Sequence, residues 1–237
     1  MQSIADSLLI AIALIAQFDA ELLRIVALSL QVSATACLIG AGGGLLLGAW
    51  LAVARFPGHA ALVWAVNTLL ALPSVVVGLI VYLLLSRSGP LGSWGILFTP
   101  TAMVVAQSIL VVPLIAALSR RLVLGALRDG GDQLRSLGAG RFGSALLLLV
   151  HERFGVVTVV LTAFGRAIAE VGAVMIVGGN IAGATRVMTT AIALETSKGD
   201  LPLALALGLV LLGVVGAING LVALLPSGGG IREEALA

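Results

Sequence analysis

The sequence has 237 residues, of which 60% are hydrophobic and only 10% are charged, and its mean hydropathy is +1.19. This composition excludes an ordinary water-soluble globular domain. The basic isoelectric point does not indicate a nucleic-acid-binding protein, because lysine occurs once and the arginines separate long apolar runs. We therefore expect a protein embedded in the lipid bilayer, with no nucleic-acid partner.

The first apolar stretch covers residues 4–18 and is short for a membrane span. We interpret it as an interfacial helix, joined to the first span by a link that ends at residue 21. A sixth span over the same residues is the alternative. Residues 1–18 contain no Lys or Arg, whereas a secretory signal begins with a basic region, so we expect no cleavage here.

Five longer apolar runs follow, and each is long enough to cross the roughly 30 Å of hydrocarbon as a helix. The sequence thus predicts an all-α membrane protein of about five transmembrane helices plus the N-terminal interfacial helix. The transmembrane domain is expected to cover residues 22–226, between the N-terminal segment 1–21 and a cytoplasmic tail, 227–237. The predicted spans are Ile25 to Ala54, Ala60 to Leu85, Ile96 to Leu118, Val156 to Val177 and Leu201 to Leu225.

The basic residues predict the orientation, because Lys and Arg are retained in short cytoplasmic segments. If the segment 119–155 is cytoplasmic, eight arginines lie inside, four basic residues lie outside and Arg166 lies within a span. No phosphate-binding loop of the form G-x-x-x-x-G-K-[ST] is present, so ATP hydrolysis is expected on another polypeptide. The inside set is Arg55, Arg120, Arg121, Arg128, Arg135, Arg141, Arg153 and Arg232, and the outside set is Arg24, Arg87, Arg186 and Lys198.

Glycine and proline mark special positions within the spans. The cluster Gly40-Ala41-Gly42-Gly43-Gly44 lies in the first span and predicts a face where helices pack closely, because small residues let backbones approach in lipid. Pro73 and Pro113 fall within the second and third spans, where each removes a backbone hydrogen bond. We predict that these two prolines act as helix hinges, with a fixed bend as the alternative.

Arg166 and Glu170 are the charged residues of the fourth span. Their spacing of four predicts that they share one face of a helix. A charge at this depth costs about 2.5–3.5 kcal/mol, and such residues usually face a bundle interior or a water-filled cavity. Two interpretations stay open: a self-neutralising pair that locks neighbouring helices, or a pair that lines or gates the path of an anion.

The same residues open a motif that resembles a known family. Arg166-Ala-Ile-Ala-Glu170-Val-Gly172-Ala173, followed by Gly178-Gly179-Asn180-Ile181, is similar to a block of the type I ABC importer permeases for molybdate, sulfate and tungstate. The run from Thr185 to Gly199 resembles the tungstate branch in particular. The resemblance extends to Leu72-Pro73, Gly78, Gly89-Pro90-Leu91-Gly92, Gln107 and Val112-Pro113.

Type I permeases carry a cytoplasmic loop with the pattern E-A-A, three residues, then G, which docks as a short coupling helix onto the ATPase. Here Asp132, Gln133 and Leu134 stand at the first three positions and Gly138 matches the glycine. Both small residues are replaced, and the proline found further on in many relatives is missing near Val150 and His151. The resemblance thus implies that these four residues couple the permease to its ATPase.

The resemblance further implies the type I ABC importer permease fold and an assembly in the bacterial inner membrane. This assembly would contain a homodimer of the chain, a separate ATP-binding cassette ATPase subunit with ATP and Mg, and a periplasmic oxyanion-binding protein. No cofactor is expected on this chain. The implied cargo is tungstate, with molybdate, sulfate or another solute of the same importer class as the alternative.

A path for a tetrahedral dianion should offer hydroxyl and amide donors. Thr158, Thr162 and Asn180 are the candidates, and the segment 178–200 is expected to form part of a periplasmic gate and docking surface. A threonine in a membrane helix can instead bond to its own backbone. An ATP-independent channel and an intramembrane enzyme are distant alternatives, and we predict neither a catalytic residue nor a metal site.

Overall fold

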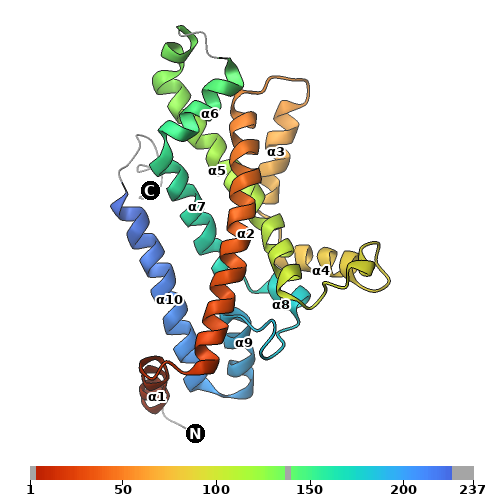
Figure 1. Ribbon diagram of the computed structural model, residues 1–237, viewed down its shortest axis with the longest axis vertical. Coiled ribbons are helices and arrows are strands. Elements are labelled where there is room, and N and C mark those ends of the chain that lie inside the picture. Colours follow the sequence, from red (N-terminus) through yellow and green to blue (C-terminus); the bar gives the residue numbers. More distant parts are fainter. Residues whose placement is uncertain (1–3, 137–139, 226–237) are drawn as a thin grey trace. The chain divides into compact units, whose positions relative to one another are not determined.

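The computed structural model describes residues 4–136 and 140–225, and these contain helices joined by short links, with no strand. Figure 1 shows the course of the chain. The α-helices are α1 (Ile4–Ala16), α2 (Ala20–Val53), α3 (His59–Leu69), α4 (Ser74–Leu85), α5 (Pro100–Ser136), α6 (Arg141–His151), α7 (Arg153–Ile168), α8 (Gly172–Gly178), α9 (Met188–Lys198) and α10 (Leu201–Leu224), with the 3-10 turn η1 (Gly92–Trp94) before α5.

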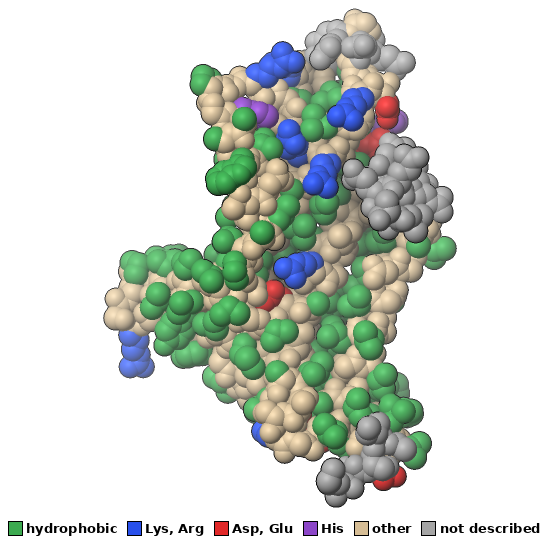
Figure 2. All heavy atoms as spheres, turned by 180° about the vertical axis from the view of Figure 1, so that it is seen from behind, with side chains coloured by type: hydrophobic (Ala, Val, Ile, Leu, Met, Phe, Trp, Pro, Cys, Tyr) green, Lys and Arg blue, Asp and Glu red, His purple; other side chains and the backbone are tan. Residues whose placement is uncertain are grey.

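The predicted all-α membrane fold is confirmed. By length and composition, α2, α10 and Pro100–Gly131 of α5 can each cross a bilayer, and the number of spans rises to five if each of two bent helix pairs counts as one. Large apolar side chains such as Leu38 and Leu212 are about 70% exposed on these helices, as expected where the solvent is lipid. Figure 2 shows hydrophobic side chains spread over the face that it displays, with few charges between them.

The second and fourth predicted spans are not continuous helices, so this part of the prediction is wrong. The second is divided into α3 and α4, which meet at an angle of 98°. Pro73 stands directly before α4 with extended backbone angles, and its missing N–H suits it to the entry of a helix. Pro113, in contrast, lies inside α5, which runs on to Ser136 without a break. A hinge role for either proline stays a prediction.

The fourth predicted span is also interrupted, by an irregular segment between α7 and α8. The α6–α7 pair is bent by 79° at Glu152, α7 ends at Ile168, and the separate helix α8 begins at Gly172. The predicted span from Val156 to Val177 therefore contains the C-terminal part of α7, an irregular segment and most of α8.

The described chain forms two compact units that interleave in sequence. Among the described residues, the first contains 4–36, 73–107 and 165–218, and the second contains 37–72, 108–136, 140–164 and 219–225. The domain boundaries expected from the sequence, after residues 21 and 226, stay a prediction. The two units divide the helical core itself and do not test those boundaries. All seven described arginines of the predicted inside set belong to the second unit, whereas the four outside residues and Arg166 belong to the first.

Within the second unit, α2 packs on α5 through glycines spaced four residues apart. A Cβ atom added to Gly40 would lie 2.7 Å from Val111 Cγ1, and one added to Gly48 would lie 2.4 Å from the carbonyl oxygen of Ala116. Gly44 is equally tight against α5, and Ser119 Oγ donates to the carbonyl of Leu45 on α2 at 3.2 Å. The predicted glycine packing face is thus confirmed for Gly40 and Gly44, and it extends to Gly48.

Within the first unit, α4 and α8 lie side by side (Figure 1). Gly78 makes this possible, because a Cβ atom at this position would lie 2.8 Å from Ala173 Cα. The contact buries Val77 and Val81 of α4 and Val174 of α8. It fixes α8, and with it the end of the irregular segment that precedes α8.

Candidate functional site

The irregular segment between α7 and α8 holds a buried carboxylate. Glu170 is 7% exposed, and its Oε1 accepts a hydrogen bond from the backbone N–H of Ala173 at 3.2 Å. The backbone carbonyl of Glu170 accepts from the hydroxyl of Thr189 on α9 at 2.8 Å. Glu170 therefore satisfies a free N–H in the first turn of α8 and ties the segment to α9.

The expected pairing of Arg166 with Glu170 is wrong. The spacing of four places two side chains on one face only inside a continuous helix, and α7 ends at Ile168, between the two residues. Arg166 is exposed while Glu170 is buried, and no ion pair within the described ranges 4–136 and 140–225 includes either side chain. Their roles in a pathway or gate stay predictions.

Gln107 of α5 completes the polar cluster at this break. Its Nε2 donates to the carbonyl of Ala167 in the last turn of α7 at 2.9 Å, and the residue is 4% exposed. Its Oε1 is buried and has no partner among the residues that the structure describes. The buried groups at the break are thus mainly acceptors, namely a carboxylate, an amide oxygen and backbone carbonyls, and such groups oppose a dianion. The arrangement suits a point where the backbone changes direction.

The loop from α8 to α9 is held by short-range hydrogen bonds. The hydroxyl of Thr185 donates to the carbonyl of Gly178 at 2.5 Å and accepts from the N–H of Ile181 at 3.0 Å. Asn180 has left-handed backbone angles, with φ at 51°, and its Nδ2 donates to the carbonyl of Thr190 at 3.2 Å. One amide donor of Asn180 is therefore bonded to α9, and the proposed part of Asn180 in the pathway is untested.

Thr158 and Thr162 both bond to their own helix. Each hydroxyl donates to the carbonyl four residues earlier, at 3.0 Å for Thr158 and 2.8 Å for Thr162. Thr158 is half-buried and Thr162 is exposed on α7, and the only hydroxyl hydrogen of each is engaged in this geometry. Donation to an anion requires each hydroxyl to rotate away, so their role in a pathway stays a prediction.

Two of the positive charges expected on the outer surface are paired within the chain. Glu195 on α9 is 5% exposed, and its Oε1 lies 3.0 Å from Lys198 Nζ and 3.7 Å from Arg186 Nη1. Arg186 also lies 3.4 Å from Glu21, and its side chain is 13% exposed. Local sequence patterns do not reveal most of this network, because Glu21 lies 165 residues before Arg186 and only the i, i+3 spacing of Glu195 and Lys198 signals any of it.

The described coupling residues lie within α5, close to its C-terminal end. Asp132, Gln133 and Leu134 belong to the last turns of α5. Gly138 and the side chains of Asp132 and Gln133 lie outside the described residues. The segment belongs to the same compact unit as the seven arginines, and its coupling role stays a prediction.

No protein-family model matches the chain. Individual relatives do. The tungstate uptake system permease protein TupB of Peptoclostridium acidaminophilum is 42% identical over 226 residues, which are 94% of this chain and 97% of that protein. A probable anion ABC transporter permease protein of Haloferax volcanii is 42% identical over 84% of this chain and 88% of its own length. The chain belongs to the family of ABC transporter permeases.

The resemblance predicted from the sequence motifs is therefore confirmed. The molybdenum transport system permease protein ModB of Escherichia coli K12 is a more distant relative, 31% identical over 74% of this permease and 81% of its own length. The permease is a multi-pass membrane protein and a transport subunit, and its helices agree with this family.

The structure predicts that Glu170 and Arg166 contribute unequally to the stability of the permease. Glu170→Ala should lower the free energy of unfolding by about 1–3 kcal/mol, because it leaves the buried N–H of Ala173 without an acceptor. Glu170→Gln keeps an oxygen at this position and should be much closer to the unmodified permease. Arg166→Ala should change the stability little, because Arg166 is exposed and unpaired in the described part of the chain.

The difference is measured by heating the three detergent-solubilised variants and using size-exclusion chromatography to determine how much folded permease remains at each temperature. A joint ion pair at this site predicts instead that Arg166→Ala and Glu170→Gln destabilise the permease to the same extent. That result would restore the pairing that the structure excludes.

Proposed function

We propose that this permease is the membrane subunit of an ATP-driven importer that moves tungstate from the periplasm to the cytoplasm. The observation that carries the proposal is the 42% identity to a tungstate uptake permease along 94% of the chain. The relatives that transport molybdenum are 30% to 31% identical over about three quarters of it. The difference favours tungstate over molybdate as the cargo.

The partners in this proposal are a second copy of the permease, ATP-binding cassette ATPase subunits and a periplasmic binding protein that delivers the oxyanion. ATP and Mg would bind to the ATPase. The membrane is then the inner membrane of a bacterium, since a periplasmic binding protein acts from its outer side.

The distribution of arginine supports the proposed orientation. The unit that contains the C-terminal end of α5 also contains all seven described arginines of the predicted inside set. Lys and Arg near the ends of spans favour the cytoplasmic side. The coupling segment after α5 is therefore proposed to face the cytoplasm, where an ATPase hydrolyses ATP.

In this proposal the anion does not bind at the break before α8. Buried acceptors at Gln107 and Glu170 oppose a dianion there. We propose that this break, together with the bend at Pro73, absorbs the change between inward- and outward-facing states, because backbone outside regular helices can change its angles at low cost.

Transport in membrane vesicles tests the function. Vesicles that contain the permease, its ATPase and its binding protein should take up labelled tungstate in the presence of ATP, and omission of ATP should abolish the uptake. A tenfold excess of unlabelled molybdate should compete less well than the same excess of tungstate. Equal uptake without ATP would indicate a channel, and preferred uptake of molybdate or sulfate would reassign the cargo.

A further inference from the structure

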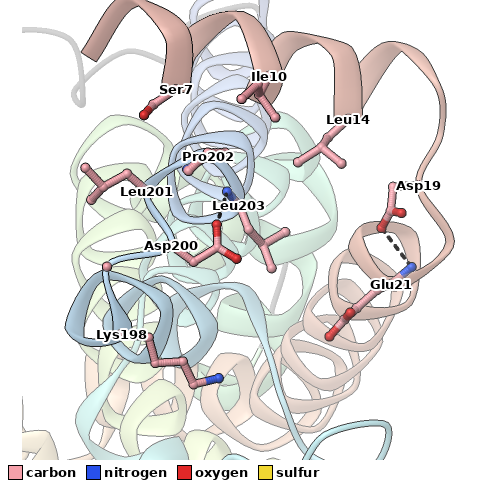
Figure 3. Close-up of a pocket in the computed structure, with 11 residues that line it drawn as sticks. Ser7, Ile10, Leu14, Asp19, Glu21, Lys198, Asp200, Leu201, Pro202 and Leu203 are labelled. Atoms are coloured by element: carbon pink, nitrogen blue, oxygen red, sulfur yellow. Dashed lines mark hydrogen bonds between the residues drawn. The ribbon is translucent and has the colours of Figure 1, made fainter. Parts of the chain in front are cut away.

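A pocket of about 840 Å³ lies in the first unit, between α1 and the junction of α9 with α10. Figure 3 shows that α1 forms one wall, with Ile10 and Leu14 pointing down from it, and that Lys198, Asp200 and Leu203 form the opposite wall. Asp19 and Glu21 lie at the side, where α1 is joined to α2. The transport function proposed above makes no use of this pocket.

The pocket carries an excess of negative charge. Asp19, Glu21 and Asp200 supply carboxylates, and Lys198 supplies an ammonium group. An oxyanion is therefore repelled here, and a ligand with a positive group is attracted.

Asp19 and Asp200 each use only one carboxylate oxygen, Oδ1, in hydrogen bonds to the described residues. Asp19 Oδ1 accepts from the N–H groups of Glu21 and Leu22 at the start of α2, at 3.0 and 2.9 Å. Asp200 Oδ1 accepts from the N–H of Leu203 at the start of α10, at 3.4 Å. In the part of the chain that the structure covers, the second oxygen of each carboxylate takes no hydrogen bond or ion pair. Both remain available to N–H donors of a ligand.

Ser7 gives independent evidence of a ligand. Its side chain is fully buried, it lines the pocket, and its hydroxyl has no hydrogen-bond partner among the described residues. In Figure 3 the hydroxyl points from α1 toward the opposite wall. A buried hydroxyl without a partner costs free energy, so a ligand that supplies a polar atom at this point is stabilised.

The position of α1 indicates that this ligand is a lipid. The helix has 13 residues and is about 20 Å long, which is too short to cross the hydrocarbon layer. Leu9 and Ile12 are 68% and 51% exposed, as expected for a helix that lies at the surface of the bilayer. The pocket beneath it combines apolar side chains with charges, which matches the border between headgroups and acyl chains.

We propose that this pocket binds a phospholipid whose headgroup carries a primary ammonium group. The ammonium donates to a free carboxylate oxygen of Asp19 or Asp200, and the phosphate lies near Lys198, whose side chain is 51% exposed and keeps donors beyond its bond to Glu195. A phosphate or ester oxygen of the lipid accepts from Ser7, and the acyl chains pack on the apolar side of α1. A choline headgroup fits less well because it has no N–H donor, and a net anionic lipid is opposed by the carboxylates.

Native mass spectrometry of the full-length permease in detergent tests this proposal, with phosphatidylethanolamine, phosphatidylcholine and phosphatidylglycerol of the same acyl chains as probes. Phosphatidylethanolamine should bind at least about tenfold more tightly than the other two, as expected for charge-assisted hydrogen bonds. The double variant Asp19→Asn, Asp200→Asn should lose this preference. It should still fold, because asparagine caps helices as well as aspartate does.

Two further measurements separate this site from general lipid binding. Ser7→Ala should weaken the binding of phosphatidylethanolamine, whereas Asp129→Asn, which removes an exposed carboxylate of α5, should leave it unchanged. Equal binding of the three lipids, or an unchanged preference in the double asparagine variant, would overturn the proposal. So would equally tight binding of glycerophosphoethanolamine, which has no acyl chains and would identify a site for small amines.

Discussion

Gly48→Leu should prevent the permease from reaching its folded state in useful yield. The Cβ atom of any larger residue would lie 2.4 Å from the carbonyl oxygen of Ala116 and 2.9 Å from the backbone N of Arg120. Backbone atoms cannot move aside as the end of a side chain can, so α2 and α5 must separate. The expected cost is about 3 kcal/mol or more, at the upper end of the range for overpacked cores.

The same helix provides a matched control. Gly43 is exposed, and a Cβ atom added to it meets nothing within 4 Å. Gly43→Leu should therefore give a yield and a melting temperature close to those of the unmodified permease. Membrane insertion, yield after solubilisation and thermal unfolding of the two variants decide the matter. Equal loss in both would mean that α2 tolerates no bulk on any face, and the specific contact with α5 would lose its support.

Gly138→Trp should leave the permease in the membrane but reduce ATP-driven uptake at least about tenfold, which corresponds to the loss of about 1.4 kcal/mol of coupling free energy. The expectation rests on the resemblance of residues 132–138 to the coupling loop of type I permeases. A large side chain there would hold the ATPase away from the segment that follows α5.

The control for this prediction is Gly140→Ser in the same loop. Gly140 has ordinary extended backbone angles, and open space surrounds its missing side chain. Tungstate uptake and ATP hydrolysis in reconstituted vesicles should both be close to normal in this variant. ATP hydrolysis without uptake in Gly138→Trp would locate the defect in coupling, whereas normal uptake would remove Gly138 from this role.

Hydropathy and charge were sufficient to predict an all-α membrane protein, because an uncharged run of 20 or more residues has few alternatives in lipid. They could not predict that the second and fourth spans are broken. A hydropathy average does not depend on the backbone path, so α3 and α4 have the apolar composition of one span although they meet at 98°. Pro73 was the signal for this break, and it predicted a kink of unspecified size.

The site was harder to predict than the fold. The i, i+4 rule assumed a helix through Arg166 and Glu170, and only the end of α7 at Ile168 shows why it fails. The bond from the N–H of Ala173 to Glu170 requires the helix to break before α8, and the bond from the hydroxyl of Thr189 requires the first turn of α9 to contact that break. No local pattern encodes that contact. The motif around Glu170 was still sufficient to predict the family, because a family resemblance does not require the geometry of the site.

The spacing of Gly40, Gly44 and Gly48 has a mechanical consequence for the second unit. Two helices that pack closely at three successive glycines cannot slide far without a collision, so we expect α2 and α5 to translate and rotate together in this unit. A displacement applied at the C-terminal end of α5 would then be transmitted to the level of Gly40.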